Sequence, residues 1–210
     1  EQLKDLAVSY GRGRLLREGL RVVIAGKPNA GKSSLLNYLS GHSRAIVTEI
    51  PGTTRDTIEE FTEIDGYPVW ITDTAGLRSS DDPVERIGIE KARAEIQNAD
   101  LVLYMADPGE NHLIDRETEA ILPENTVVLL NKTDIAEKGQ IQRVRERFSK
   151  YRTIEISVLQ KKGIEKVIDP IKKRFDCYDG NGAILTNARH KQLIDESIEA
   201  LKRGLDQYRL

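Results

Sequence analysis

A glycine-rich segment between an apolar run and a helical pattern carries the residue types best suited to chemistry. Residues 26–33 read G-K-P-N-A-G-K-S, after the apolar residues 22–25 and before leucines at helical spacing. This pattern between a strand and a helix is typical of a phosphate-binding loop. The glycines let backbone N–H groups surround an anion, Lys32 can reach the β- and γ-phosphates, and the Ser33 hydroxyl can bind Mg²⁺.

A second motif, N-K-T-D at residues 131–134, follows the β-rich run 126–130. This order predicts a position at the carboxyl end of a strand, where open α/β sheets bind ligands. A carboxylate there accepts hydrogen bonds from both N1–H and the 2-amino group of guanine, and adenine has no such pair of donors. Asp134 therefore favours GTP over ATP. The alternative, an ordinary turn at a strand end, does not explain why the motif accompanies a phosphate loop in this order.

Two further motifs complete a GTPase set. Asp73 and Gly76 frame a D-x-x-G motif, which supplies a carboxylate near Mg²⁺ and a glycine N–H for the γ-phosphate. Upstream, the polar segment 51–56 reads P-G-T-T-R-D. A threonine there can close over Mg²⁺ when the γ-phosphate is present, which predicts switch I. Analogy with related GTPases that carry one threonine at this place favours Thr54 over Thr53.

The segment S-V-L at residues 157–159 resembles the last guanine-contacting motif of such proteins, which is usually S-A-x. Valine stands where alanine is usual. We therefore expect Ser157 and Val158 to lie beside the base.

Composition limits the class of protein. The chain has 210 residues, of which 39% are hydrophobic, enough for one substantial core and a small appendage. Its 32 basic and 34 acidic residues give a formal charge of −2, so no overall basic field indicates strong nucleic-acid binding. The single cysteine, Cys177, permits no internal disulfide. Because no long apolar run or signal-like segment is present, we expect a soluble, cytoplasmic protein without membrane contact.

Periodicity predicts an α/β fold with a mixed, mostly parallel sheet of about six strands and helices on both faces. Apolar spacing in residues 1–18 is helical but is broken by Gly11 and Gly13. The connection 64–67 predicts a tight hairpin, so that the second and third strands are antiparallel. Strands are expected at 21–25, 57–64, 68–73, 100–106, 126–130 and 152–156, and helices at 32–40, 85–97, 113–121, 138–149, 162–174 and 188–210.

Two departures from Ras-like GTPases narrow the class. Leu77 follows D-x-x-G where Ras-like proteins carry the glutamine that orients the attacking water. Asn29 lies inside the phosphate loop, and V-E-R-I-G-I-E follows at 84–90. With I-V-T-E-I-P-G-T-T-R-D at 46–56, these segments resemble the family of bacterial tRNA-modification GTPases MnmE (TrmE), in the TrmE-Era-EngA-like branch of the P-loop GTPases.

The resemblance implies a piece of a longer protein. That family carries an N-terminal folate-binding domain, a helical domain split around the GTPase domain, and a C-terminal cysteine motif, and it modifies the wobble uridine of tRNA with a flavin-dependent partner. We expect a helical-domain remnant at 1–18, the GTPase domain at 19–176, and a linker with the returning helix at 177–210. The folate domain and the cysteine motif are not in this chain.

The resemblance also implies site residues. Glu85 would orient the attacking water through a second water, with Thr54 and Gly76 completing the catalytic set; alternatively, Glu85 only favours its helix N-terminus, and Arg55 or Arg86 serves as an arginine finger. Mg²⁺ would bind Ser33, Thr54 and, through water, Asp73. K⁺ would bind Asn29, Thr48, Ile50 and Thr53, coupled to a homodimer across the switch face. The nucleotide set is Asn29, Ala30, Gly31, Lys32, Ser33, Ser34, Thr48, Thr53, Thr54, Asp73, Gly76, Asn131, Lys132, Asp134, Ser157 and Val158.

Two other functions stay open at this point. One is a ribosome-assembly GTPase of the Era or double-GTPase type, although residues 180–210 predict a single helix with no G-x-x-G loop of a KH-like RNA-binding domain. The other is a nucleotide-switched scaffold in which hydrolysis is incidental.

Overall fold

A computed structural model describes residues 2–41, 58–73, 90, 93–176 and 184–208 of the chain. Two compact units are present, one formed by residues 20–171 and the other by residues 1–19 with 172–210. The helices are α1 Gln2–Glu18, α2 Lys32–Gly41, α4 Arg116–Ile121, α5 Lys138–Arg147, α6 Glu165–Asp176 and α7 Ala188–Tyr208. The strands are β1 Leu20–Gly26, β2 Ile58–Ile64, β3 Tyr67–Asp73, β4 Leu101–Ala106, β5 Thr126–Leu130 and β6 Arg152–Glu155.

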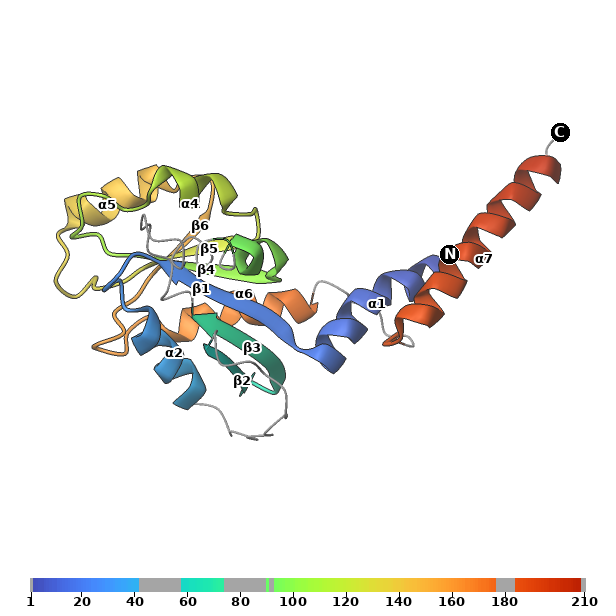
Figure 1. Ribbon diagram of the computed structural model, residues 1–210, viewed down its shortest axis with the longest axis horizontal. Helices are drawn as coiled ribbons and strands as arrows, with labels where there is room; N and C mark the ends of the chain where they lie inside the picture. The colour runs from blue at the N-terminus through green and yellow to red at the C-terminus, as the bar shows by residue number, and fades with distance from the viewer. Residues whose placement is uncertain (1, 42–57, 74–89, 91–92, 177–183, 209–210) are drawn as a thin grey trace. The chain divides into compact units, whose positions relative to one another are not determined.

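The larger unit is built on a six-stranded sheet in the order β2-β3-β1-β4-β5-β6 (Figure 1). All neighbouring strands are parallel except β2 and β3, which pair antiparallel. Asp65 and Gly66, which connect β2 and β3, both have positive φ angles, of 53° and 87°. Positive φ at both central residues is what a tight type I′ hairpin turn requires. The predicted fold class and the predicted hairpin are confirmed.

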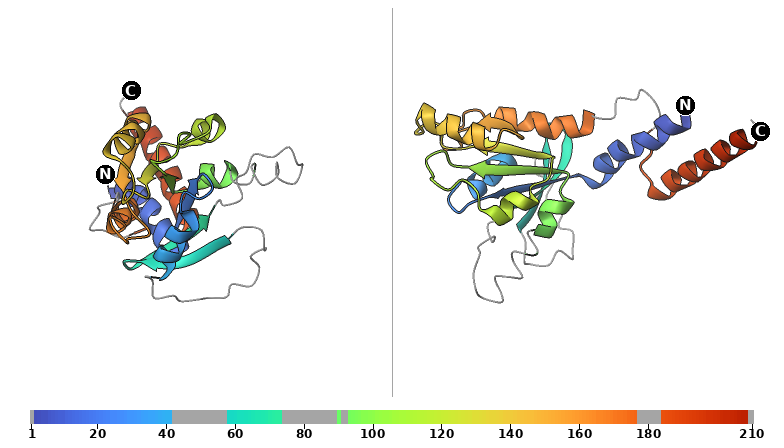
Figure 2. Two further views of the ribbon diagram at one scale, coloured as in Figure 1. Left: turned by 90° about the vertical axis from the view of Figure 1, so that its left-hand side faces the viewer. Right: turned by 90° about the horizontal axis from the view of Figure 1, so that it is seen from above.

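Helices cover both faces of the sheet (Figure 1, Figure 2). On one face, alternate residues of β1, β4 and β5 form a buried core with α5 and with the helical residues 93–98. This core includes Val23, Tyr104, Val128 and Phe148, and the hydroxyl of Tyr104 donates to the carbonyl of Leu113. The opposite face is covered by α2 and by residues 165–171 of α6, where Leu35, Leu36, Leu39, Val167 and Ile171 are buried. Because β4 and β5 are covered on both sides, every residue of these two strands is buried.

Helix boundaries differ from the expected ones by up to three residues: α5 ends at Arg147 instead of 149, and α6 spans Glu165–Asp176 instead of 162–174. The helix expected at 113–121 begins only at Arg116, because the side chain of Asp115 accepts a hydrogen bond from the Thr118 N–H and so caps the helix there. The helix expected at 85–97 is described only at residue 90 and residues 93–98, which are helical.

The smaller unit contains α1 and α7, which lie side by side (Figure 2). Helix α1 runs without interruption through Gly11 and Gly13, so these glycines do not break it. A Cβ atom on Gly13 would lie 1.9 Å from the Leu185 carbonyl oxygen. The Leu185 N–H also donates to the Ser9 hydroxyl, at 3.1 Å. Gly13 therefore serves the close approach of residue 185 to α1. In the described part of the chain, no helix has both the length and the apolar character needed to cross a bilayer.

The close approach of the Leu185 carbonyl to Gly13 predicts how substitutions change the stability of this unit. Gly13→Ala should destabilise the unit of α1 and α7 by about 1–3 kcal/mol, because the added methyl meets backbone atoms that must move. Gly204→Ala in α7 is the matched control, since nothing lies within 4 Å of its Cβ position, and it should stabilise the helix by about 0.5–1 kcal/mol. Urea unfolding followed by circular dichroism measures both. Equal effects of the two substitutions would contradict the packing role of Gly13.

Candidate nucleotide site

The phosphate-binding loop lies between the end of β1 at Gly26 and the start of α2 at Lys32. Its backbone needs glycine at both ends: Gly26 has a φ of 141° and Gly31 a φ of 103°. A Cβ on Gly26 would lie 2.4 Å from the Met105 carbonyl oxygen, and one on Gly31 would lie 2.3 Å from Nδ2 of Asn131. The glycines are thus required by packing against β4 and Asn131, apart from any approach of a ligand.

Lys32 lies across this loop at the N-terminus of α2. Its ammonium group donates to the Lys27 carbonyl at 2.9 Å, and the residue is only 7% exposed. Burial lowers the pKa of Lys32, and the charge of Asp73 opposes that change. A phosphate in the loop would place negative charge beside this buried cation, which is the arrangement that favours phosphate binding at a helix N-terminus.

Ser33 and Asp73 meet at the start of α2. The Ser33 hydroxyl donates to Oδ2 of Asp73 at 2.9 Å, and Asp73 is 7% exposed. Its other oxygen, Oδ1, is buried and has no hydrogen-bond partner among the described residues. A buried carboxylate oxygen without a partner and an adjacent hydroxyl are hard oxygen donors of the kind that Mg²⁺ prefers. The residues present therefore fit the metal that the two motifs predict.

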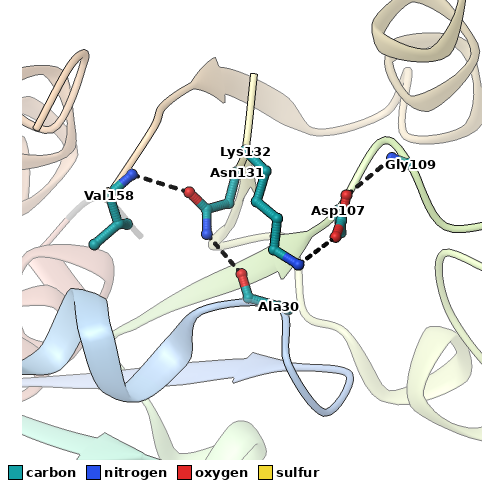
Figure 3. A network of polar contacts seen from close by, with 6 residues as sticks. All are labelled: Ala30, Asp107, Gly109, Asn131, Lys132 and Val158. Atoms are coloured by element: carbon teal, nitrogen blue, oxygen red, sulfur yellow. Dashed lines mark hydrogen bonds and ion pairs between the residues drawn. The ribbon is translucent and has the colours of Figure 1, made fainter. Parts of the chain in front are cut away.

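Asn131 joins three loops of the site. Its side-chain Nδ2 donates to the carbonyl of Ala30 in the phosphate loop at 2.7 Å, and its Oδ1 accepts from the N–H of Val158 at 3.1 Å (Figure 3). The residue is 3% exposed. Both ends of the Asn131 amide are therefore used to hold the protein together, and its contribution to a nucleotide is to fix the positions of its neighbours.

The loop after β6 is closed on itself. Ser157 exchanges both backbone hydrogen bonds with Lys162, and its buried hydroxyl accepts from the Gln160 N–H at 3.1 Å. The side chain of Gln160 donates to Oδ2 of Asp134 at 3.4 Å, a long bond between exposed groups. This long contact joins the Asp134 carboxylate to the loop after β6, and a stronger hydrogen-bond donor could replace it.

These elements enclose one cavity of about 700 Å³. Several predicted residues line it, namely Asn29, Gly31, Ser34, Asn131, Lys132, Asp134, Ser157 and Val158. The structure thus brings the phosphate loop and the proposed guanine motifs to a single concave surface at the carboxyl ends of β1, β5 and β6, as parallel α/β sheets commonly do.

The cavity also has a lining that the sequence analysis missed. Ile135 and Leu159 border it with side chains that are 77% and 88% exposed. Asn37, Tyr38, Gly41 and Lys161 complete the lining. Exposed aliphatic residues directly after N-K-T-D and after Ser157-Val158 are apolar surface of the kind that suits a planar ring. Their signal in the sequence is their position: Ile135 directly follows N-K-T-D, and Leu159 is the third residue of S-V-L.

Six residues of the predicted site lie outside the described residues. They are Thr48, Ile50, Thr53, Thr54, Gly76 and Glu85. Arg55, Arg86 and Leu77 also lie outside them. Their predicted roles stay predictions.

A phosphate loop between β1 and α2, a guanine-type motif after β5 and a mostly parallel sheet define the class of P-loop GTPase domains. Residues 21–132 match the family described as 50S ribosome-binding GTPase; the chain belongs to this family and is a GTP hydrolase.

Similarity to individual proteins extends over nearly the whole chain. A tRNA modification GTPase MnmE from Acetivibrio thermocellus is 42% identical over 98% of this chain, and one from Pseudoalteromonas atlantica is 44% identical over 99%. The resemblance to the MnmE family is confirmed. The chain spans less than half of these relatives, 46% of the length of each.

Solved structures support the fold. The G domain of the FeoB iron transporter of T. maritima has a TM-score of 0.51 at 24% identity, covering 74% of this chain and 98% of that chain. The cytosolic domain of L. pneumophila FeoB has a TM-score of 0.52 at 22% identity, over 73% and 68%.

Because Asn131 joins the phosphate loop to the loop after β6, its loss should affect both nucleotide binding and stability. Asn131→Ala should weaken GDP binding at least about 10-fold and destabilise the domain by about 1–3 kcal/mol, because it frees the phosphate loop and leaves the Ala30 carbonyl and the Val158 N–H unpaired. Calorimetric titration with GDP and thermal unfolding measure the two effects.

Asn125 provides the matched control. Asn125 lies just before β5, at the opposite end of that strand from Asn131. Its side-chain amide donates to the carbonyls of Ala99 and Asp100. Asn125→Ala should cost similar stability and leave GDP affinity unchanged. If the two variants lost affinity equally, the loss would reflect general destabilisation and not the link between the loops.

Proposed function

We propose that this GTPase domain serves a longer protein that modifies the wobble uridine of tRNA in the cytoplasm. Support comes from relatives named tRNA modification GTPase that are more than 40% identical over nearly the whole chain. In this proposal the longer protein works with tRNA and a flavin-dependent partner, while the chain described here binds and hydrolyses GTP.

Guanine selectivity rests on Asp134 in the cavity wall. The single observation that carries this part is the common cavity formed by Asp134 and the phosphate loop, held together by Asn131. The Asp134 carboxylate accepts from N1–H and the 2-amino group of guanine, displacing its long contact with Gln160. The buried Lys32 and the N-terminus of α2 receive the phosphates.

Mg²⁺ would be held by Ser33, by Thr54 and, through water, by Asp73. When bound, it neutralises charge on the β- and γ-phosphate oxygens. Ser33 and Asp73 are preplaced for this task by their mutual hydrogen bond, and the unpartnered Oδ1 of Asp73 supports it.

Hydrolysis needs a group that orients water, since Leu77 cannot do so. We assign that task to Glu85, acting through a second water, with Thr54 and the Gly76 N–H completing the site. The support is the likeness to MnmE relatives, which extends over 98% of the chain. Arg55 and Arg86 are the alternative source of positive charge.

A monovalent cation, K⁺, would be held by Asn29 with Thr48, Ile50 and Thr53. When bound, it supplies positive charge at the phosphates, the task of an arginine finger in GTPases that use one. Asn29 has a φ of 61° and lines the cavity, which supports its access to the nucleotide. Because the segment 48–53 would complete this cage and also belong to a homodimer across the switch face, ion binding and dimerisation would be linked.

Base selectivity tests the nucleotide assignment. Asp134→Asn should weaken GDP binding about 10- to 100-fold, since a charge-assisted pair of hydrogen bonds is replaced by a mismatched donor. Xanthosine diphosphate should bind the variant better than GDP, because the amide can donate to the additional xanthine oxygen. Calorimetry with both nucleotides makes the comparison, and recovered binding of xanthosine diphosphate shows that the variant is folded. Undiminished GDP affinity would exclude Asp134 from base recognition.

The cation assignment is tested by comparing KCl with NaCl at equal ionic strength. GTP hydrolysis should be faster in KCl, and GDP with aluminium fluoride should produce dimers in KCl only, as measured by light scattering. Asn29→Gly should remove the KCl response while sparing GDP affinity, because glycine accepts the positive φ without strain. Equal rates and equal dimer fractions in both salts would contradict the proposal.

A further inference from the structure

Lys132, the lysine of N-K-T-D, is held by a carboxylate that none of the GTPase motifs includes. Its ammonium group lies 2.6 Å from Oδ2 of Asp107, the first residue after β4 (Figure 3). The sheet brings the two together, since Ala106 and Leu130 are paired and the Asn131 N–H donates to the Ala106 carbonyl at 2.8 Å. Asp107 and Lys132 therefore leave neighbouring strands side by side.

Asp107 is itself fixed by the turn that follows it. Its Oδ1 accepts from the Gly109 N–H at 2.9 Å, and its carbonyl accepts from the Glu110 N–H at 3.1 Å. One carboxylate oxygen thus closes the turn and the other receives Lys132. The side chain of Asp107 is only 13% exposed, whereas that of Lys132 is 37% exposed.

Arg143 of α5 anchors the same turn. Its guanidinium donates to the carbonyls of Pro108 and Glu110, at 2.9 and 2.7 Å. A chain of contacts therefore runs from α5 through the turn to Asp107 and on to Lys132. This anchoring makes the carboxylate a fixed point and not a freely rotating surface group.

Lys132 lines the cavity, but Asp107 is not part of the lining. The contact that joins Asp107 to the cavity is its ion pair with Lys132. A lysine side chain has large rotamer freedom. The backbone of Lys132 has a φ of 60°, which is unfavourable for a residue with a Cβ. Holding both ends of this side chain before a ligand arrives removes much of the ordering cost from the binding step.

We propose that Asp107 is a positioning residue for nucleotide binding: it holds Lys132 extended along the cavity wall, so that the methylene stem offers an apolar face to the base and the ammonium group is fixed beyond it. This role rests on the proposed nucleotide site and adds a residue to it. Because GDP and GTP share the base and ribose, Asp107 acts on the affinity for both and not on the chemical step.

A double-mutant cycle tests the proposal, with GDP as the probe in calorimetry. Asp107→Asn keeps an oxygen for the Gly109 N–H but loses the charge, and it should weaken GDP binding about 2- to 10-fold. KM for GTP should rise by the same factor with kcat unchanged. In the Lys132→Met background, the Asp107→Asn change should have no further effect, because its target is gone.

Two further variants serve as controls for the double-mutant cycle. Asp107→Ser, whose hydroxyl can also accept from Gly109, should behave like Asp107→Asn and serves if that variant folds poorly. Asp115→Asn, at the cap of α4 in the same connection, should bind GDP as the wild type does.

Each contrary result has a distinct meaning. Equal losses from Asp107→Asn in both backgrounds would show a merely structural turn and overturn the role. Unchanged GDP binding in Asp107→Asn would also overturn the role. Tighter GDP binding would overturn it too, because it would show that Asp107 holds Lys132 away from the ligand. Failure of the wild-type chain to bind GDP would instead overturn the proposed guanine site, and this role with it.

Discussion

The side-chain amide of Asn131 is the interaction on which the site depends. It donates to the Ala30 carbonyl and accepts from the Val158 N–H, so one buried group joins segments about 100 and 27 residues away in the sequence. A buried amide that lost either partner would carry an unsatisfied polar group, at a cost of about 1–3 kcal/mol. The relative placement of the phosphate loop and the base-binding loop is therefore set by hydrogen bonding within the protein.

The phosphate loop meets a second constraint at its glycines. Gly26 faces the Met105 carbonyl and Gly31 faces the Asn131 amide, each at a distance that a Cβ atom could not occupy. A motif usually explained by the approach of a phosphate is thus also demanded by the packing of β1 against β4 and of the loop against N-K-T-D. Because the same residues satisfy both demands, a substitution there would disturb the protein before any ligand is considered.

The sheet, its antiparallel hairpin and the motif residues that line the cavity are predictable from the sequence, because each depends on local pattern and on the order of motifs along the chain. Features whose cause is a distant contact are not predictable in this way. Apolar spacing predicts a helix break at Gly13, yet this glycine lies inside α1 and makes room for the Leu185 carbonyl. Asp107 had no motif of its own, and its link to Lys132 arises only when β4 and β5 pair. The start of α4 is a local feature, because Asp115 caps it, but the apolar periodicity predicts an earlier start at 113.

Under the proposed function, the described residues of the site bind the base, the loop phosphates and Mg²⁺, and protein contacts such as Asn131 to Val158 and Lys132 to Asp107 hold several of them before a ligand arrives. These contacts are available to GDP and GTP alike, and a ligand pair that interacts equally with a site cannot shift any conformational equilibrium through it. Discrimination between the two nucleotides must therefore come from groups near the γ-phosphate. In the predicted set those are Lys32, Thr54 and Gly76. Under the proposed function, the residues that line the cavity give guanine affinity, and the response to the γ-phosphate rests on Lys32, Thr54 and Gly76.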